Sequence, residues 1–213
     1  MRIGLVLGGD PPSSADLKLL DACDEIVACD AGAHALLQGA RPPSVIVGDL
    51  DSLDPETYKW ADALDVPFER HPEGKDFTDG ELALDRVLAM GATNVLVLGG
   101  HGGRSAMFLA NLKLLRRCHD RGVEAVMIGN GESIRFVGPG DGLAIAGRAG
   151  STINVLAIDG DTVVSLEGMS WNAEETRLRA ASARGVSNRI EKDGARVRVH
   201  EGLAIVVLEQ PRD

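Results

Sequence analysis

The chain has 213 residues, a formal net charge of −10 and three cysteines. This length allows one large domain or two small ones, each able to bury a core. The 32 acidic residues against 22 basic ones argue against a general surface for nucleic acid or for an anionic membrane. Cys23, Cys29 and Cys118 form no CxxC pair, which favours buried thiols in a reducing compartment. The amino terminus begins directly with a strand pattern and no stretch reaches about 18 uninterrupted apolar residues. We therefore expect a soluble cytoplasmic protein.

Short apolar stretches alternate with helical patterns along the first part of the chain. Strands are predicted at 3–7, 26–29, 45–47, 94–98 and 124–128, and helical segments at 32–37, at 55–64 and after residue 78. This alternation predicts βαβ units and a largely parallel sheet that is covered on both faces. Each predicted strand is followed by a glycine or a carboxylate. A substrate cleft at the carboxyl edge of the sheet explains that pattern better than stability alone.

Two carboxylates one residue apart, Asp49 and Asp51, follow the strand at 45–47 and the turn residue Gly48. In open α/β sheets, ligands bind beyond the carboxyl ends of the strands. The pair is therefore placed to share one hard cation. A β-turn aspartate beside a helix-capping neighbour explains these residues equally well when they are taken alone.

A second acidic pair, Asp76 and Asp79, lies where the next helix begins. Thr78 and Glu81 have the spacing of a capping box, so Asp79 falls in the first helical turn and Asp76 just before it. One acid there could serve only the helix dipole. Four acids at two junctions between loop and helix instead favour magnesium, which binds a few carboxylates and keeps positions for water and phosphate oxygens.

A glycine-rich turn at 99–103 precedes Arg104 and another predicted helix. Arg104 and the backbone amides at that helix start could face phosphate, or Arg104 could form a surface ion pair. Asn111 lies two turns later on an apolar face, where either a nucleotide or a buried backbone carbonyl would satisfy it. His101 is more easily explained as incidental than as a base. Lys75 is either a phosphate contact or a solvated side chain.

Helical spacing disappears beyond about Gly138. Short strand patterns recur between glycine-containing turns, with alternation of period two at 195–200 and an apolar run at 203–208. These patterns predict a small antiparallel sandwich or barrel-like second domain.

In their joint order and spacing, the motifs resemble those of the thiamine pyrophosphokinase (thiamine diphosphokinase) family. They are Asp30-Ala31-Gly32-Ala33, Gly48-Asp49-Leu50-Asp51-Ser52, Asp76-Phe77-Thr78-Asp79, Gly102-Gly103-Arg104 with Asn111, Trp171, and Gly185-Val186-Ser187-Asn188. The resemblance covers nearly the whole chain. It implies an α/β, Rossmann-like domain with a parallel sheet at 1–137, which binds ATP and magnesium, and a β-sandwich domain at 138–213, which binds thiamine.

The resemblance also implies an activity and a role for each matching residue. The activity is transfer of a pyrophosphoryl group from ATP to the hydroxyl of thiamine, which yields thiamine diphosphate and AMP. Catalytic roles fall to Asp49, Asp51, Asp76 and Asp79, of which Asp49, Asp51 and Asp79 would hold Mg²⁺; nucleotide binding falls to Asp30, Lys75, Arg104 and Asn111; thiamine binding falls to Trp171, Ser187 and Asn188. The indole face of the tryptophan would attract a cationic thiazolium, although core packing would also explain a tryptophan and a turn would explain the Ser-Asn pair. A homodimer with its active site at the subunit interface is implied, without nucleic-acid or membrane partners.

One departure from the family pattern concerns the helix after the glycine-rich turn. The family usually carries an Asp-His pair where this chain has Ala106 and Met107. The difference leaves three hypotheses open: thiamine pyrophosphorylation without the pair, the same chemistry on a different acceptor alcohol, and a non-catalytic protein that binds nucleotide or thiamine.

Overall fold

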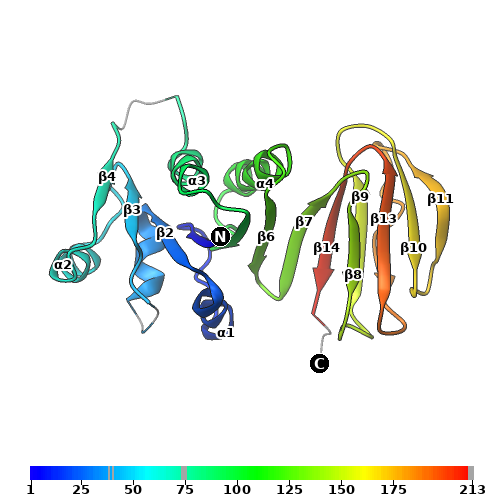
Figure 1. Ribbon diagram of the computed structural model, residues 1–213, viewed down its shortest axis with the longest axis horizontal. Coiled ribbons are helices and arrows are strands. Elements are labelled where there is room, and N and C mark those ends of the chain that lie inside the picture. Colours follow the sequence, from blue (N-terminus) through cyan, green and yellow to red (C-terminus); the bar gives the residue numbers. More distant parts are fainter. Residues whose placement is uncertain (38, 40, 73–75, 211–213) are drawn as a thin grey trace. The chain divides into compact units, whose positions relative to one another are not determined.

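The computed structural model describes residues 1–37, 39, 41–72 and 76–210. The chain divides into two compact units, Met1–Asn130 and Gly131–Asp213. Helices and strands alternate in the first unit, whereas the second consists of strands (Figure 1). The division into functional domains at residue 137 remains a prediction, since the compact units divide seven residues earlier.

The first unit contains a parallel sheet with the strand order β6-β5-β1-β2-β3-β4. The strands are β1 (Arg2–Val6), β2 (Glu25–Cys29), β3 (Val45–Gly48), β4 (Phe68–Arg70), β5 (Asn94–Leu98) and β6 (Glu124–Gly129). The strand order reverses between β1 and β5, because the chain adds β2, β3 and β4 on one side of β1 and then β5 and β6 on the other. Ligand sites of open α/β sheets lie at such a switch point, outside the carboxyl ends of the strands.

Helices cover both faces of this sheet, as the alternating pattern predicts. They are α1 (Ser14–Leu17), the 3₁₀ helices η1 (Lys18–Ala22) and η2 (Asp30–Leu36), α2 (Pro55–Ala63), α3 (Asp79–Ala89) and α4 (Ser105–His119). Figure 1 shows α3 and α4 on one side of the sheet and α1 and α2 on the other. Leu20, Leu36 and Ala61 pack with Ile26 and Ile46 in one buried cluster. Within the described part of the chain, no helix has the length and apolar character needed to cross a membrane.

The second unit contains two sets of antiparallel strands that share one apolar core. The first set has the order β12 (Asn188–Arg189), β9 (Thr152–Ala157), β14 (Ala204–Glu209) and β7 (Glu132–Val137). The second set has the order β11 (Ala173–Leu178), β10 (Thr162–Glu167), β13 (Ala195–Glu201) and β8 (Gly142–Ile145). The predicted alternation at 195–200 is confirmed, since Val197 and Val199 are buried while Arg196 and Arg198 are exposed. β7 belongs to this unit because it pairs with β14 along its full length.

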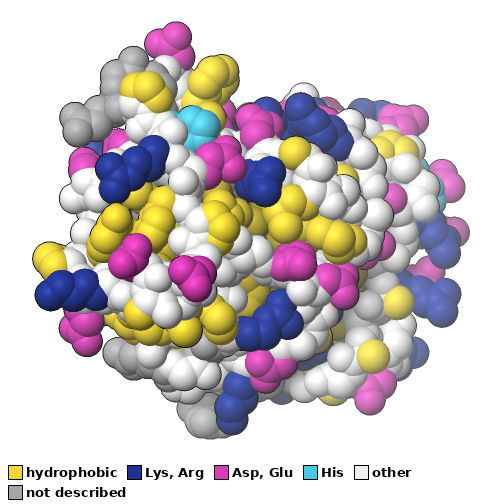
Figure 2. All heavy atoms as spheres, turned by 60° about the vertical axis from the view of Figure 1, so that its left-hand side comes forward, with side chains coloured by type: hydrophobic (Ala, Val, Ile, Leu, Met, Phe, Trp, Pro, Cys, Tyr) yellow, Lys and Arg dark blue, Asp and Glu magenta, His cyan; other side chains and the backbone are white. Residues whose placement is uncertain are grey.

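Charged side chains of both signs are intermingled on the surface in Figure 2, without a continuous basic patch on the face shown. That distribution is consistent with the net charge of −10. Both observations argue against a phosphate-backbone binding surface there, which would require clustered lysine and arginine.

Candidate active site

Three carboxylates converge at the carboxyl edge of the parallel sheet. Asp30 directly follows β2, Asp49 directly follows β3, and Asp79 is the first residue of α3. One carboxylate oxygen from each lies within 4.8 Å of the others. Among the described residues, these three form the group of acidic, histidine or cysteine side chains that could hold a metal ion.

Backbone geometry brings Asp30 against the loop that follows β3. Asp30 has φ 44°, in the left-handed region that Asp and Asn tolerate better than most other residues. Its Oδ1 accepts a hydrogen bond from the Leu50 N–H at 2.9 Å. A methyl group on Gly48 would lie 2.2 Å from the same oxygen. Glycine is therefore required at position 48 for the carboxylate to approach the loop so closely.

The electrostatics of the group favour a bound cation. The pKa of Asp30 is raised to about 6, mainly because burial penalises the charged form and further because Asp79, Asp49 and Asp51 are nearby negative charges. The hydrogen bond from Leu50 offsets only part of this effect. A cation would neutralise the repulsion, and a set of carboxylate oxygens selects a hard cation such as Mg²⁺ over softer metals.

The capping hydrogen bonds at the start of α3 involve Thr78 and Glu81 rather than the Asp79 carboxylate. Thr78 is the N-cap, its hydroxyl accepts the Glu81 N–H, and the Glu81 carboxylate accepts the Thr78 N–H, so the predicted capping box is present. Asp79 is half-buried and benefits from the positive end of the helix dipole. Its carboxylate can therefore serve the group of three acids.

The other predicted acids lie outside this group. Asp51 is exposed, and its backbone N–H donates to Asp49 Oδ1 at 3.1 Å. Asp76 is also exposed. The predicted metal set is Asp49, Asp51 and Asp79. The structure instead groups Asp49 and Asp79 with Asp30, which was predicted as a nucleotide contact. Asp30 shares with Asp49 the signal of an acid directly after a strand.

The glycine-rich turn after β5 is joined to the loop after β1 at the switch point. The Gly9 N–H donates to the Gly99 carbonyl and the Asp10 N–H donates to the His101 carbonyl, both at 2.8 Å. A methyl group on Gly9 would lie 2.3 Å from the His101 carbonyl oxygen. The Asn111 side chain donates to the Gly100 carbonyl at 3.0 Å. Asn111 therefore has the backbone partner that was one of its two predicted alternatives, and it positions the turn.

The remaining predicted residues of the first unit have different surroundings. The His101 ring is buried, and its centroid lies 5.8 Å from that of Phe108, which indicates a packing role. Arg104 is exposed at the N-cap of α4, and its side chain makes no capping hydrogen bond. It stands where a guanidinium and helix-start amides could bind phosphate together. Lys75 lies outside the described residues.

The predicted thiamine residues meet in the second unit. Asn188 is 6% exposed; its Oδ1 accepts the Trp171 N–H at 3.0 Å and its Nδ2 donates to the Trp171 carbonyl at 2.8 Å. The Asn188 amide thus holds the backbone that carries the indole. Ser187 is exposed and has φ 60°, and its N–H donates to Asn154 Oδ1 at 2.8 Å. The Trp171 ring is partly buried against the core.

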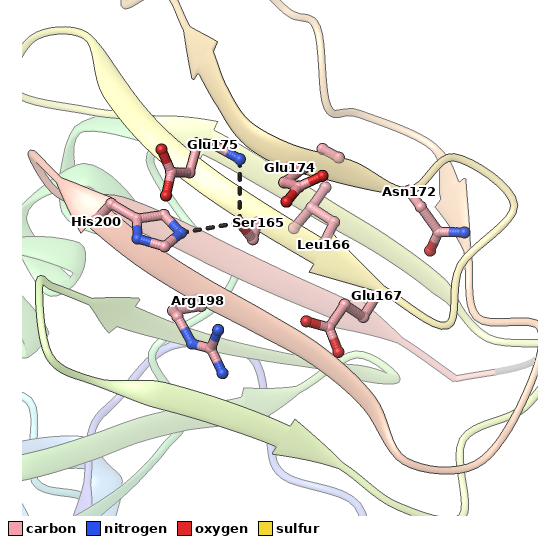
Figure 3. A pocket seen from close by; sticks show the side chains of 9 residues that line it. Ser165, Leu166, Glu167, Asn172, Glu174, Glu175, Arg198 and His200 are labelled. Carbon is pink, nitrogen blue, oxygen red and sulfur yellow. Dashed lines mark hydrogen bonds between the residues drawn. The ribbon is translucent and has the colours of Figure 1, made fainter.

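A pocket of about 480 Å³ on the outer face of β10, β11 and β13 was not predicted. Figure 3 shows Ser165, Glu175 and His200 at one end of it, with Ser165 Oγ 2.8 Å from His200 Nε2 and accepting the Glu175 N–H at 3.1 Å. The pairing of β10 with β11 changes register between Val164 and Leu166, on either side of Ser165, and Glu175 has φ 40°. Ser165 therefore satisfies an N–H that the β-bulge removes from the ladder. No motif in the sequence indicates a bulge of this kind.

Comparison with known proteins adds to this geometry. The family model "Thiamin pyrophosphokinase, catalytic domain" matches residues 17–127, just over half of the chain. The model "Thiamin pyrophosphokinase, vitamin B1 binding domain" matches residues 145–204. A curated thiamine pyrophosphokinase of Bacillus subtilis is 27% identical over 140 residues, and the aligned region covers 65% of this chain and 65% of that protein's length.

Solved structures share the fold over nearly the whole chain. A thiamine pyrophosphokinase structure from Bacillus subtilis has a TM-score of 0.88 at 21% identity and covers 100% of both chains. One from Geobacillus thermodenitrificans has a TM-score of 0.84 at 24% identity, covering 98% of this chain and 97% of that one. The yeast thiamin pyrophosphokinase structure has a TM-score of 0.76 at 18% identity, covering 98% and 86%.

Proposed function

This chain belongs to the thiamin pyrophosphokinase family, and from that premise we propose that it transfers a pyrophosphoryl group from ATP to the hydroxyl of thiamine. The products are thiamine diphosphate and AMP. The observation that carries the proposal is the convergence of Asp30, Asp49 and Asp79 within 4.8 Å at the carboxyl edge of the parallel sheet. That edge is where the fold class binds its ligands.

The acids form the proposed magnesium site. Asp49 and Asp79 bind the cation together with Asp30, and Asp51 contributes from the exposed side of the same loop. Two observations support this assignment. Oxygen donors are the ligands that a hard cation prefers, and a bound cation would offset the burial and repulsion that raise the pKa of Asp30. When bound, Mg²⁺ supplies neutralisation of the polyphosphate charge.

The chain's own residues bind and orient the two substrates. Arg104 and the first amides of α4 bind the polyphosphate, Asn111 positions the glycine-rich turn beneath it, and Lys75 is a further nucleotide contact. The thiamine oxygen forms a bond to the β-phosphorus while the bond from that phosphorus to the bridging oxygen of AMP breaks. Asp76 accepts the hydroxyl proton. Because little covalent chemistry is required of the protein, positioning and charge supply the rate enhancement.

The second unit supplies the acceptor site. Trp171 stacks on a thiamine ring, with Ser187 and Asn188 beside it. The match of residues 145–204 to a vitamin B1 binding domain supports thiamine over a different acceptor alcohol, despite Ala106 and Met107. We further propose a homodimer with its active site at the subunit interface. A cytoplasmic location is supported by the three buried cysteines, which are thiols rather than disulfides.

Formation of AMP from ATP, measured with and without thiamine, tests the proposal. We expect AMP and thiamine diphosphate to form in equal amounts when thiamine and Mg²⁺ are present, and no AMP above background without thiamine. Asp79→Asn removes a proposed metal ligand and should reduce the rate by more than the ~10–100-fold that loss of an outer-shell partner costs. Equal AMP formation without thiamine, or none under any condition, would contradict the proposed reaction.

A further inference from the structure

The cationic side chain of Arg184 lies beside Trp171, the residue proposed to stack on thiamine. The guanidinium carbon of Arg184 lies 5.1 Å from the centroid of the Trp171 ring. That distance is within the range of a cation–π contact. Arg184 is exposed, whereas Trp171 is partly buried against the apolar core of the second unit. The Trp171 ring is therefore in contact both with the apolar core and with an exposed cation.

Backbone contacts hold both ends of this pair, and these contacts do not involve the guanidinium. Asn188 binds both the N–H and the carbonyl of Trp171. Next to Arg184, the Gly185 carbonyl accepts the Val155 N–H at 2.9 Å, and a methyl group on Gly185 would lie 2.3 Å from the Val155 carbonyl oxygen. These contacts with β9 fix the backbone position next to Arg184. Its long, solvent-exposed side chain can swing away without breaking any of these backbone contacts.

A thiazolium ring and a guanidinium are attracted to the same feature, the negative face of the indole. They carry the same charge, so they repel each other when both approach one ring. We propose that Arg184 is a resident competitor of thiamine on Trp171, and that thiamine binds by displacing its guanidinium. Arg184 thereby sets the affinity for a cationic acceptor. This inference rests on the proposed function, because it assigns Trp171 to thiamine.

The test compares thiamine kinetics of the wild type with three variants of exposed arginines. Arg184→Gln keeps a polar side chain of similar reach but removes the charge, and should lower KM for thiamine about 2–5-fold, the equivalent of an exposed cation–π contact. Its kcat should stay within twofold. Arg184→Lys keeps the charge and should keep KM within twofold of the wild type. Arg179→Gln removes a charge from an exposed position of the same loop and should leave KM unchanged.

Direct binding provides a readout that is independent of turnover. The chain has two tryptophans, so a Trp60→Phe background isolates Trp171 fluorescence. Titration with thiamine in the absence of ATP should show tighter binding for Arg184→Gln than for its parent. If the wild type forms thiamine diphosphate while Arg184→Gln has an unchanged or higher KM, competition is wrong and the proposed function stands. If the wild type neither binds thiamine nor forms AMP, the proposed function fails and the inference fails with it.

Discussion

Replacement of Asp30 by Asn should make the metal-free protein more stable and nearly inactive. Asn tolerates the left-handed backbone at φ 44° and can still accept the Leu50 N–H. The substitution therefore removes the charge of a side chain that is only 8% exposed and keeps its local contacts. Burial and, secondarily, the neighbouring acids raise the folded-state pKa of this carboxyl to about 6, so its ionised form costs stability.

The size and sign of the effect follow from the pKa. The folded-state value of about 6 exceeds the ordinary 3.8, so the folded state binds the proton more tightly than the unfolded state. Stability from this group is fully present below about pH 4 and is lost as the pH rises through about 6. At about 1.4 kcal/mol per pKa unit, the cost at pH 7.5 is about 1–3 kcal/mol. Asn at position 30 should recover that amount at pH 7.5 and none of it near pH 4.

Urea unfolding in the presence of EDTA, at pH 7.5 and near pH 4, measures the predicted difference, provided that the slope with urea is the same for both proteins. Asp51→Asn is the matched control, because it removes an exposed acid from the same edge and should change stability by less than about 0.5 kcal/mol. Added Mg²⁺ should stabilise the wild type more than Asp30→Asn. A variant that is less stable than the wild type by the same amount at both pH values would refute the reasoning, since hydrogen bonding would then outweigh the burial cost.

Three further variants test the packing and the departure from the family pattern. Gly48→Ala should destabilise the protein by about 1–3 kcal/mol in thermal unfolding, because the new methyl group would lie 2.2 Å from a carboxylate oxygen; an unchanged Tm would contradict the close approach. Asn188→Ala leaves the Trp171 N–H and carbonyl without their side-chain partner, so it should lower the free energy of unfolding in urea by about 1–3 kcal/mol and raise KM for thiamine. An unaltered KM would argue against a positioning role for Asn188. The double variant Ala106→Asp with Met107→His should raise the rate of thiamine turnover, by no more than the ~10²–10⁴-fold that one positioned acid–base group contributes. Efficient turnover by the wild type, with no gain in the double variant, would show that the Asp-His pair is dispensable.

Much of the fold was predictable because the decisive interactions are local. Strand β5 has the bounds expected from its apolar run, and Thr78 with Glu81 forms the expected capping box. A parallel sheet places the carboxyl ends of its strands along one edge, so acids that follow β2 and β3 had to lie near each other. β4 was not predicted, because its three residues show no pattern that separates a strand from the surrounding loop, and β7 was not predicted although Ile134 and Phe136 alternate with polar residues.

The composition of the site depended on three-dimensional contacts that no spacing encodes. Asp30 joins Asp49 and Asp79 because it has a positive φ and because Gly48, 18 positions away, lacks the side chain that would exclude its carboxylate. The pairing of Arg184 with Trp171 likewise depends on backbone contacts made by Gly185 and Asn188. Strand and capping chemistry, which acts within a few residues, therefore made the edge at which the acids gather predictable. Which of these side chains touch was not predictable, because side-chain direction depends on the packing of segments that are distant in the chain.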